Sequence, residues 1–149
     1  MKHIKAIIVF FLLVMSSNQY FAQASGNAVD DLKFCRENGI FSDRQDVRKA
    51  CLFTIFKEKD EAALPFLIKR LQTEPDTEIQ TFIARVIQKL DNVEGIKALE
   101  KFAWSDGDFK VRWVCRSICK TYAEQHSGSY KFNLARLDER LKLDRPNNM

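Results

Sequence analysis

A pattern that recurs every 32 residues constrains this chain more than any other feature of its sequence. Val47, Ile79 and Val111 occupy equivalent places after three short polar turns, and successive members are 32 residues apart. Five more sets of apolar residues keep the same register: Ala50/Phe82/Val114, Cys51/Ile83/Cys115, Ile55/Ile87/Cys119, Leu32/Leu64/Ile96 and Cys35/Leu67/Leu99. Six matched sets indicate an internal structural repeat, and repeats of about this length build solenoids and related arrays.

Each repeat is predicted to be a hairpin of two α-helices. The second helix of each hairpin carries apolar residues along one face of a helix with about 3.6 residues per turn. The turn before it holds Asp, Ser or Thr, whose oxygens can accept the free N–H groups of a first helical turn. Gly39 is expected to end the first helix of the first hairpin in left-handed backbone. The predicted helices span residues 28–38, 46–58, 61–72, 77–90, 93–104 and 109–125.

Two of the turns and two of the first helices carry a family resemblance. They resemble the Asp-Pro-x-x-x-Val-Arg turn and the first helix of HEAT-like repeats, most closely the short repeats of phycobilisome-lyase-type proteins. The segments concerned are residues 63–67, 74–79, 95–99 and 106–112. The resemblance covers residues 28–125 and implies a helical scaffold. Two positions depart from the pattern, since Gln80 stands where Arg is usual and Arg44 stands where the other units have Asp.

The expected fold is all-α: a short, right-handed, HEAT-like α-solenoid of three helical hairpins plus a C-terminal capping helix. The hairpins span about residues 28–58, 61–90 and 93–125. One hairpin cannot bury its apolar face alone, and about three stacked units are the minimum for a stable array. Residues 130–142 are predicted to cap the array, because three leucines form a narrow apolar stripe along an otherwise charged segment.

The first 24 residues have the pattern of a cleavable signal peptide. A basic start precedes an apolar run over residues 6–15, and Ala22 and Ala24 supply the small residues of a cleavage site after Ala24. The run is too short to cross a bilayer core, which needs about 20 residues. We therefore expect a periplasmic or secreted protein whose single mature domain spans residues 25–149, with no membrane insertion after cleavage.

The charge of the mature chain is nearly balanced. The leader holds two of the 24 Lys and Arg residues and none of the 20 Asp and Glu residues, which leaves a formal charge of +2. That excess is too small to indicate nucleic acid or an acidic membrane as the partner. We expect another protein as the partner and no cofactor, and the oligomeric state stays open.

The four cysteines fall into two pairs. Cys35 and Cys51 occupy core positions on the two helices of the first hairpin, so export favours a disulfide between them over two buried thiols. Cys115 and Cys119 lie four residues apart on one helix, where a disulfide would be strained, so they are expected to stay reduced. Together with His126 they could supply only three ligands from one helix, which argues against zinc.

The sequence contains no recognisable catalytic constellation. His126 is the single histidine of the mature chain, and the five glycines do not cluster into a phosphate-binding loop. The acidic residues near the turns, among them Asp76, Asp106, Asp108 and Glu78, are explained as helix caps and first-turn charges. We therefore expect a protein that is not an enzyme.

Residues that depart from the repeat mark a candidate partner-binding surface. Trp113 replaces Lys49 and Thr81 of the other units, so its position is expected to face water, and exposed Trp beside Arg is typical of binding hot spots. Two aromatic residues flank it, and three basic residues four apart form a stripe. The candidate residues are Trp113, Arg112, Arg116, Lys120, Trp104 and Phe109.

Two alternatives stay open for this surface. Arg112 can instead pair with Asp76 or Asp108, because HEAT-like repeats often use such Asp–Arg contacts between units. Trp113 can instead pack under the capping helix. The free surface would then lie on the first hairpin, around Arg48, Lys49 and Leu52.

The sequence thus predicts an exported, non-catalytic protein-binding module. An inhibitor or immunity protein for an enzyme that acts in the periplasm is one such role, and an accessory scaffold for envelope assembly is another. The resemblance to lyase-associated repeats leaves a third alternative, an enzyme or cofactor-handling protein that uses Cys115 and Cys119.

Overall fold

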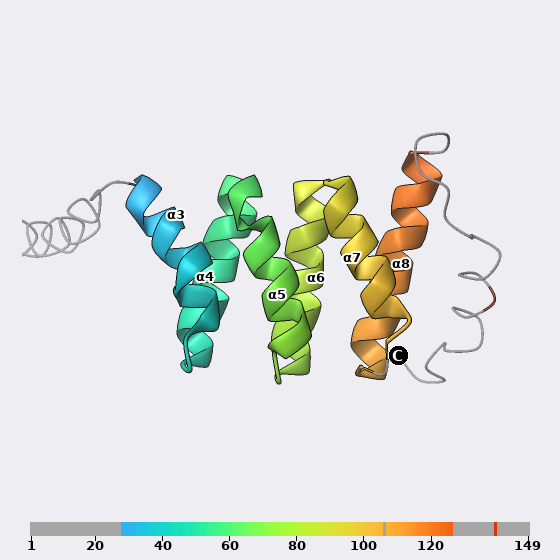
Figure 1. The fold of residues 1–149 in the computed structure, drawn as a ribbon, viewed down its shortest axis with the longest axis horizontal. Coiled ribbons are helices and arrows are strands. Elements are labelled where there is room, and N and C mark those ends of the chain that lie inside the picture. The colour runs from blue at the N-terminus through green and yellow to red at the C-terminus, as the bar shows by residue number, and fades with distance from the viewer. Residues whose placement is uncertain (1–27, 106, 127–138, 140–149) are drawn as a thin grey trace, which may run out of the picture.

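The computed structural model describes residues 28–105, 107–126 and 139 (Figure 1). Every element assigned there is helical, and none of these helices is long and apolar enough to span a membrane. The α-helices are α3 Ala28–Glu37, α4 Gln45–Glu58, α5 Leu64–Thr73, α6 Thr77–Leu90, α7 Val93–Ala103 and α8 Phe109–Gln125; the 3-10 turns are η1 Gly39–Phe41 and η2 Glu61–Ala63. The predicted all-α fold is confirmed, whereas the predicted signal peptide and capping helix lie outside the described residues.

The helices pair into three hairpins that follow one another along the longest axis of the molecule (Figure 1). Within the hairpins, α3 contacts α4, α5 contacts α6 and α7 contacts α8. Between hairpins, α4, α6 and α8 pack in sequence, and so do α3, α5 and α7. The result is a two-layered α-solenoid with first helices in one layer and second helices in the other.

The repeat positions build the core between these layers. Most of their side chains are buried, including Ile79 and Val111, which have no exposed surface. Val47 of the first hairpin is only half-buried and Ala50 is exposed, because no described hairpin packs on their outer side. Asp31 and Thr54 stand where the second hairpin has Ala63 and Val86, so the outer face of the first hairpin is more polar than a stacking face.

The helix caps show what the departure from the repeat at Arg44 changes. Asp76 accepts hydrogen bonds from the N–H groups of Glu78 and Ile79, and Asp108 does the same for the first turn of α8. Arg44 precedes α4 without capping it and pairs with Asp46 at 2.6 Å instead. The first hairpin therefore gives up the side-chain cap that the other two have.

The left-handed helix stops are not where the sequence predicts them. Lys59 and Asp91 end α4 and α6 with φ of 51° and 52°, and they are 32 residues apart. Gly39 instead begins the 3-10 turn η1. A glycine is needed there because an added Cβ would lie 2.2 Å from Cys51 Sγ. The prediction that Gly39 adopts left-handed backbone is therefore wrong, and close packing against Cys51 is the reason for the glycine.

The side chain at one position of the repeat donates hydrogen bonds to backbone carbonyls at the turn of every hairpin. Arg48 Nη1 donates to the carbonyls of Ser42 and Asp43, each at 2.9 Å. Gln80 Nε2 donates to Leu71 O at 2.9 Å, and Arg112 Nη1 donates to Ser105 O at 3.3 Å. These carbonyls lie at or beyond the end of a first helix, where backbone acceptors lack helical partners. We call positions 48, 80 and 112 the turn-closing residues.

A buried ion-pair cluster joins the first hairpin to the second. The carboxylate of Glu74 has no exposed side-chain surface and lies 3.1 Å from Arg48 Nε and 2.8 Å from Arg70 Nη2. The N–H of Asp76 also donates to Glu74 Oε1 at 3.0 Å. Every partner of this carboxylate is charged or a backbone donor, so its charge is compensated inside the stack.

We predict that Glu74→Gln lowers the free energy of unfolding by about 3 kcal/mol, because it leaves two largely buried guanidinium groups without a counter-charge. Urea denaturation followed by circular dichroism measures this. The matched control is Glu78→Gln, since Glu78 is 84% exposed and lies 3.7 Å from Lys49. It should cost less than about 1 kcal/mol. Equal losses for the two variants would contradict this assignment.

Candidate functional site

The exposed side of α4, α6 and α8, which we call the second-helix face, carries two hollows. One lies near the N-terminal ends of α6 and α8, and the other lies near the C-terminal ends of α4, α6 and α8. Both are lined by aromatic side chains together with charged ones. Preformed concave surfaces of this composition are where proteins bind ligands and partner side chains.

The first hollow has a volume of about 300 Å³ and is mainly apolar. Trp113 and Phe109 of α8 form one wall, and Thr77 and Thr81 of α6 form the other. Phe109 is exposed and Trp113 is half-buried. We call this the Trp113 hollow; it can accept one apolar side chain of a partner.

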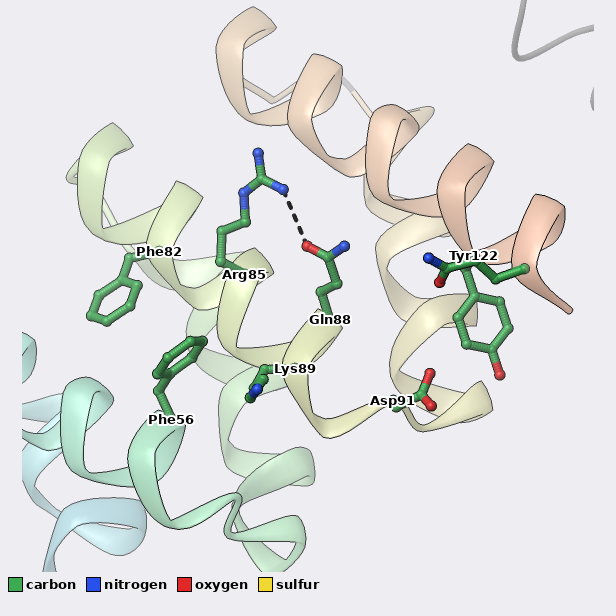
Figure 2. Close-up of a pocket in the computed structure, with 8 residues that line it drawn as sticks. Phe56, Phe82, Arg85, Gln88, Lys89, Asp91 and Tyr122 are labelled. Atoms are coloured by element: carbon green, nitrogen blue, oxygen red, sulfur yellow. Dashed lines mark hydrogen bonds between the residues drawn. The ribbon is translucent and has the colours of Figure 1, made fainter.

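The second hollow is a groove of about 760 Å³ that crosses all three second helices (Figure 2). Phe56 comes from α4, Tyr122 comes from α8, and α6 supplies the residues between them. We call it the Arg85 groove. Its lining residues are Phe56, Phe82, Arg85, Gln88, Lys89, Asp91, Tyr122 and Gln125.

The two ends of the Arg85 groove differ in chemistry. Phe56 and Phe82 meet at its α4 end, with ring centroids 6.3 Å apart, and Lys89 Nζ lies 5.7 Å from the Phe56 ring. Tyr122 and Asp91 line the α8 end (Figure 2), where His126 stacks on Tyr122 with ring centroids 4.0 Å apart and its Nε2 lies 3.9 Å from Asp91 Oδ1. The groove therefore runs from an aromatic and basic end to a polar end with one carboxylate.

Arg85 and Lys89 are uncompensated cations. Among the described residues neither forms an ion pair; Arg85 donates only to the neutral side chain of Gln88, at 3.1 Å. Other lysines of the second helices do have carboxylate neighbours, since Lys49 lies near Glu78 and Lys120 lies 3.8 Å from Glu124. The groove therefore holds two neighbouring cations that have no carboxylate partner among the described residues, whereas the Trp113 hollow has one exposed lysine, Lys110, beside Glu78.

The predicted basic stripe on α8 is wrong at Arg116. This side chain is 2% exposed, and its Nε and Nη2 donate to Ala103 O at 3.1 and 2.9 Å. Its guanidinium also lies 5.1 Å from the ring centroid of Trp104. Arg116 and Trp104 thus hold the end of α7 against α8 and do not extend the surface around Trp113.

The remaining predicted residues divide between interior and surface. Arg112 closes its turn through Ser105 O and pairs with neither Asp76 nor Asp108 in the structure. Lys120 is half-exposed. The alternative surface on the first hairpin is wrong at two of its three residues, because Leu52 is fully buried and Arg48 is 7% exposed.

The structure holds all four cysteines as buried free thiols. Cys35 and Cys51 face each other between α3 and α4, and the disulfide between them stays a prediction. Burial, together with the neighbouring thiol of Cys35, raises the pKa of Cys51 to about 12. Both thiols line a shallow hollow of about 380 Å³ between α3 and α4, beside Phe34.

Cys115 and Cys119 lie deeper. Burial raises the pKa of Cys115 to about 12 and moves the pKa of Cys119 further in the same direction. Cys119 Sγ donates to Ile96 O at 3.8 Å. Because the thiolate is the reactive form, this environment disfavours nucleophilic chemistry. Within the described ranges no three His, Cys, Asp or Glu side chains are placed to hold a metal ion.

The Arg85 groove was not predicted from the sequence. Its signal was available in the repeat, because Phe53, Arg85 and Ser117 share one position and alternate between apolar, charged and polar types. Such variation indicates a position without a packing role. The depth of the groove depends on how three helix ends meet, which the spacing alone does not describe.

Comparison with known proteins gives one family. A model described as HEAT repeats matches residues 38–119, more than half of the chain. No curated protein and no solved structure matches the chain.

Proposed function

We propose a function from one premise: the chain belongs to the HEAT-repeat family, whose repeats serve as protein-interaction scaffolds. On this premise the chain is a protein-binding module, and the second-helix face is its binding surface. The observation that carries the proposal is the Trp113 hollow, in which a half-buried Trp and an exposed Phe line a preformed, mainly apolar cavity on the second-helix face. Aromatic residues in preformed hollows supply most of the binding energy in many interfaces.

The proposal includes export to the periplasm or the exterior of the cell. It is supported by the basic start, the apolar run over residues 6–15 and the Ala-Gln-Ala motif that ends at Ala24. In an oxidising compartment Cys35 and Cys51 can close to a disulfide by exchange with a low-molecular-weight disulfide. Both thiols lose their protons, one S–S bond forms and two small thiols leave.

Two finer roles suit a small exported binding module. An inhibitor or immunity protein would bind one periplasmic enzyme and suppress its activity. An accessory scaffold for envelope assembly would bind two proteins at once, and the two hollows offer two places for contact. The stoichiometry of the purified complex separates these roles.

We further propose that the chain has no catalytic activity of its own. The acidic residues at the turns have structural duties, since Asp76 and Asp108 cap helices and Glu74 compensates two arginines. Cys115 and Cys119 are buried thiols whose raised pKa values oppose reactivity. These features argue against Cys115 and Cys119 as the nucleophiles of the lyase-like alternative.

We predict that Trp113→Ala removes binding partners that the wild-type chain captures, with a loss of affinity of at least about tenfold for each partner once purified. Partners are captured from an envelope extract and identified by mass spectrometry, and the affinity of each purified partner is measured by calorimetry. Phe109→Ser is a second variant, because Phe109 is exposed in the same hollow. Trp104→Ala is the matched control, since Trp104 packs on Arg116.

Trp104→Ala should lower the melting temperature but should still bind the partners when binding is measured below that temperature. Retention of every partner by both Trp113→Ala and Phe109→Ser would overturn the choice of this hollow. A melting temperature that collapses for Trp113→Ala but not for Phe109→Ser would assign Trp113 to packing.

A second prediction concerns the exported chain. Expressed with its leader and recovered from outside the cytoplasm, the protein should begin at Ser25 and be lighter by two hydrogens than its fully reduced form. Cys35→Ser should abolish that difference, whereas Cys115→Ser should not. Intact-protein and peptide mass spectrometry check both points. An unprocessed N-terminus would contradict export, and a fast-reacting Cys115 or Cys119 would favour the enzymatic alternative.

A further inference from the structure

We propose that the Arg85 groove binds a short acidic segment of a partner protein, in which an apolar side chain lies next to carboxylates. This inference rests on the proposed function, because it names the kind of partner that the second-helix face accepts. It concerns the groove of Figure 2 and not the Trp113 hollow.

Two cations set the charge of the segment. Arg85 and Lys89 are exposed and lie four residues apart on α6, which places their Cα atoms about 6 Å apart along the helix axis. Neither forms an ion pair within the described part of the chain. An arginine fork binds a carboxylate through two parallel hydrogen bonds, and a lysine adds a second positive point. Figure 2 shows the Arg85 side chain extending toward Gln88, whereas the Lys89 ammonium group lies against Phe56, so the two cations are presented at separate points. Two carboxylates on alternate residues of an extended segment point to the same side and can reach one cation each.

Two aromatic rings set the apolar part of the segment. Phe56 and Phe82 are half-buried and tilted by 48° to each other, so each ring keeps part of its surface open to the groove. They lie at the same end as Lys89, whose ammonium group is over the Phe56 ring. An apolar side chain two residues beyond the second carboxylate lies on the same side of an extended segment, so it would cover this surface while the carboxylates reach α6.

The groove also indicates which way an acidic segment lies. Asp91 lines the α8 end, where its Oδ1 lies 3.9 Å from His126 Nε2 and its carboxylate repels another carboxylate. The favoured place for the acidic residues is therefore the α4 end, over Arg85 and Lys89. A segment whose acidic part ends before α8 fits better than one that is acidic throughout.

The same charges argue against nucleic acid as the occupant. A nucleic-acid strand carries one phosphate for each nucleotide and needs a basic track along the path of its backbone. The groove offers two uncompensated cations and then Asp91. A local pair of carboxylates meets these requirements, whereas a continuous polyanion does not.

The test uses the full chain and a short blocked peptide with the central sequence Asp-Ser-Asp-Ser-Phe, which places both carboxylates and the ring on one side of an extended segment. Its affinity is measured by fluorescence anisotropy at low and at physiological salt. Two comparison peptides carry Asn-Ser-Asn-Ser-Phe and Asp-Ser-Asp-Ser-Gly, and a single-stranded oligodeoxynucleotide is the fourth probe. The groove variant is R85Q/K89Q. Its matched control is K33Q/K101Q, which removes two exposed lysines from the first helices α3 and α7.

We expect the Asp-Ser-Asp-Ser-Phe peptide to bind, and to lose about tenfold in affinity on R85Q/K89Q but not on K33Q/K101Q. Both comparison peptides should bind more weakly, and salt should weaken binding. Equal affinity for Asn-Ser-Asn-Ser-Phe, equal loss on the two double variants, or tighter binding of the oligonucleotide would each overturn the inference. If the peptide fails while Trp113→Ala still removes captured partners, the proposed function stands and only the acidic segment is refuted.

Discussion

The solenoid depends on one polar contact that is repeated in every hairpin. The side chain at the turn-closing position reaches back from the second helix to carbonyls at the end of the first; it is buried in Arg48 and Gln80 and partly exposed in Arg112. It supplies donors to carbonyls that have no partner within a helix. In the first hairpin the same residue, Arg48, also reaches Glu74 and joins two hairpins. The contact therefore links closure within a hairpin to stacking between hairpins.

Five basic residues of the second helices illustrate two different roles. Arg48, Arg112 and Arg116 have their guanidinium groups bonded to backbone carbonyls or to Glu74. Arg85 and Lys89 are exposed and line the groove. The sequence shows all five simply as Arg or Lys, and only their contacts in space separate the two roles.

The helices and their order could be predicted because apolar periodicity and a 32-residue spacing depend on local sequence. Gln80 illustrates why a departure need not be functional, since its amide donates to Leu71 O as the arginines do to their turns. Arg116 could not be placed in the same way. Its burial depends on Ala103 O and the ring of Trp104, which lie on another helix. The Arg85 groove likewise requires three helices whose ends meet in space.

If partners bind the second-helix face while the first helices serve packing, a bound partner should perturb only one layer of the solenoid. Backbone amide chemical shifts measured by NMR, as a partner captured through this surface is added, report which layer it contacts. The largest shifts should fall on exposed positions of α6 and α8 around Trp113 and Arg85, with little change in α3, α5 and α7. Shifts concentrated on the exposed side of α5 and α7 would contradict binding at the second-helix face.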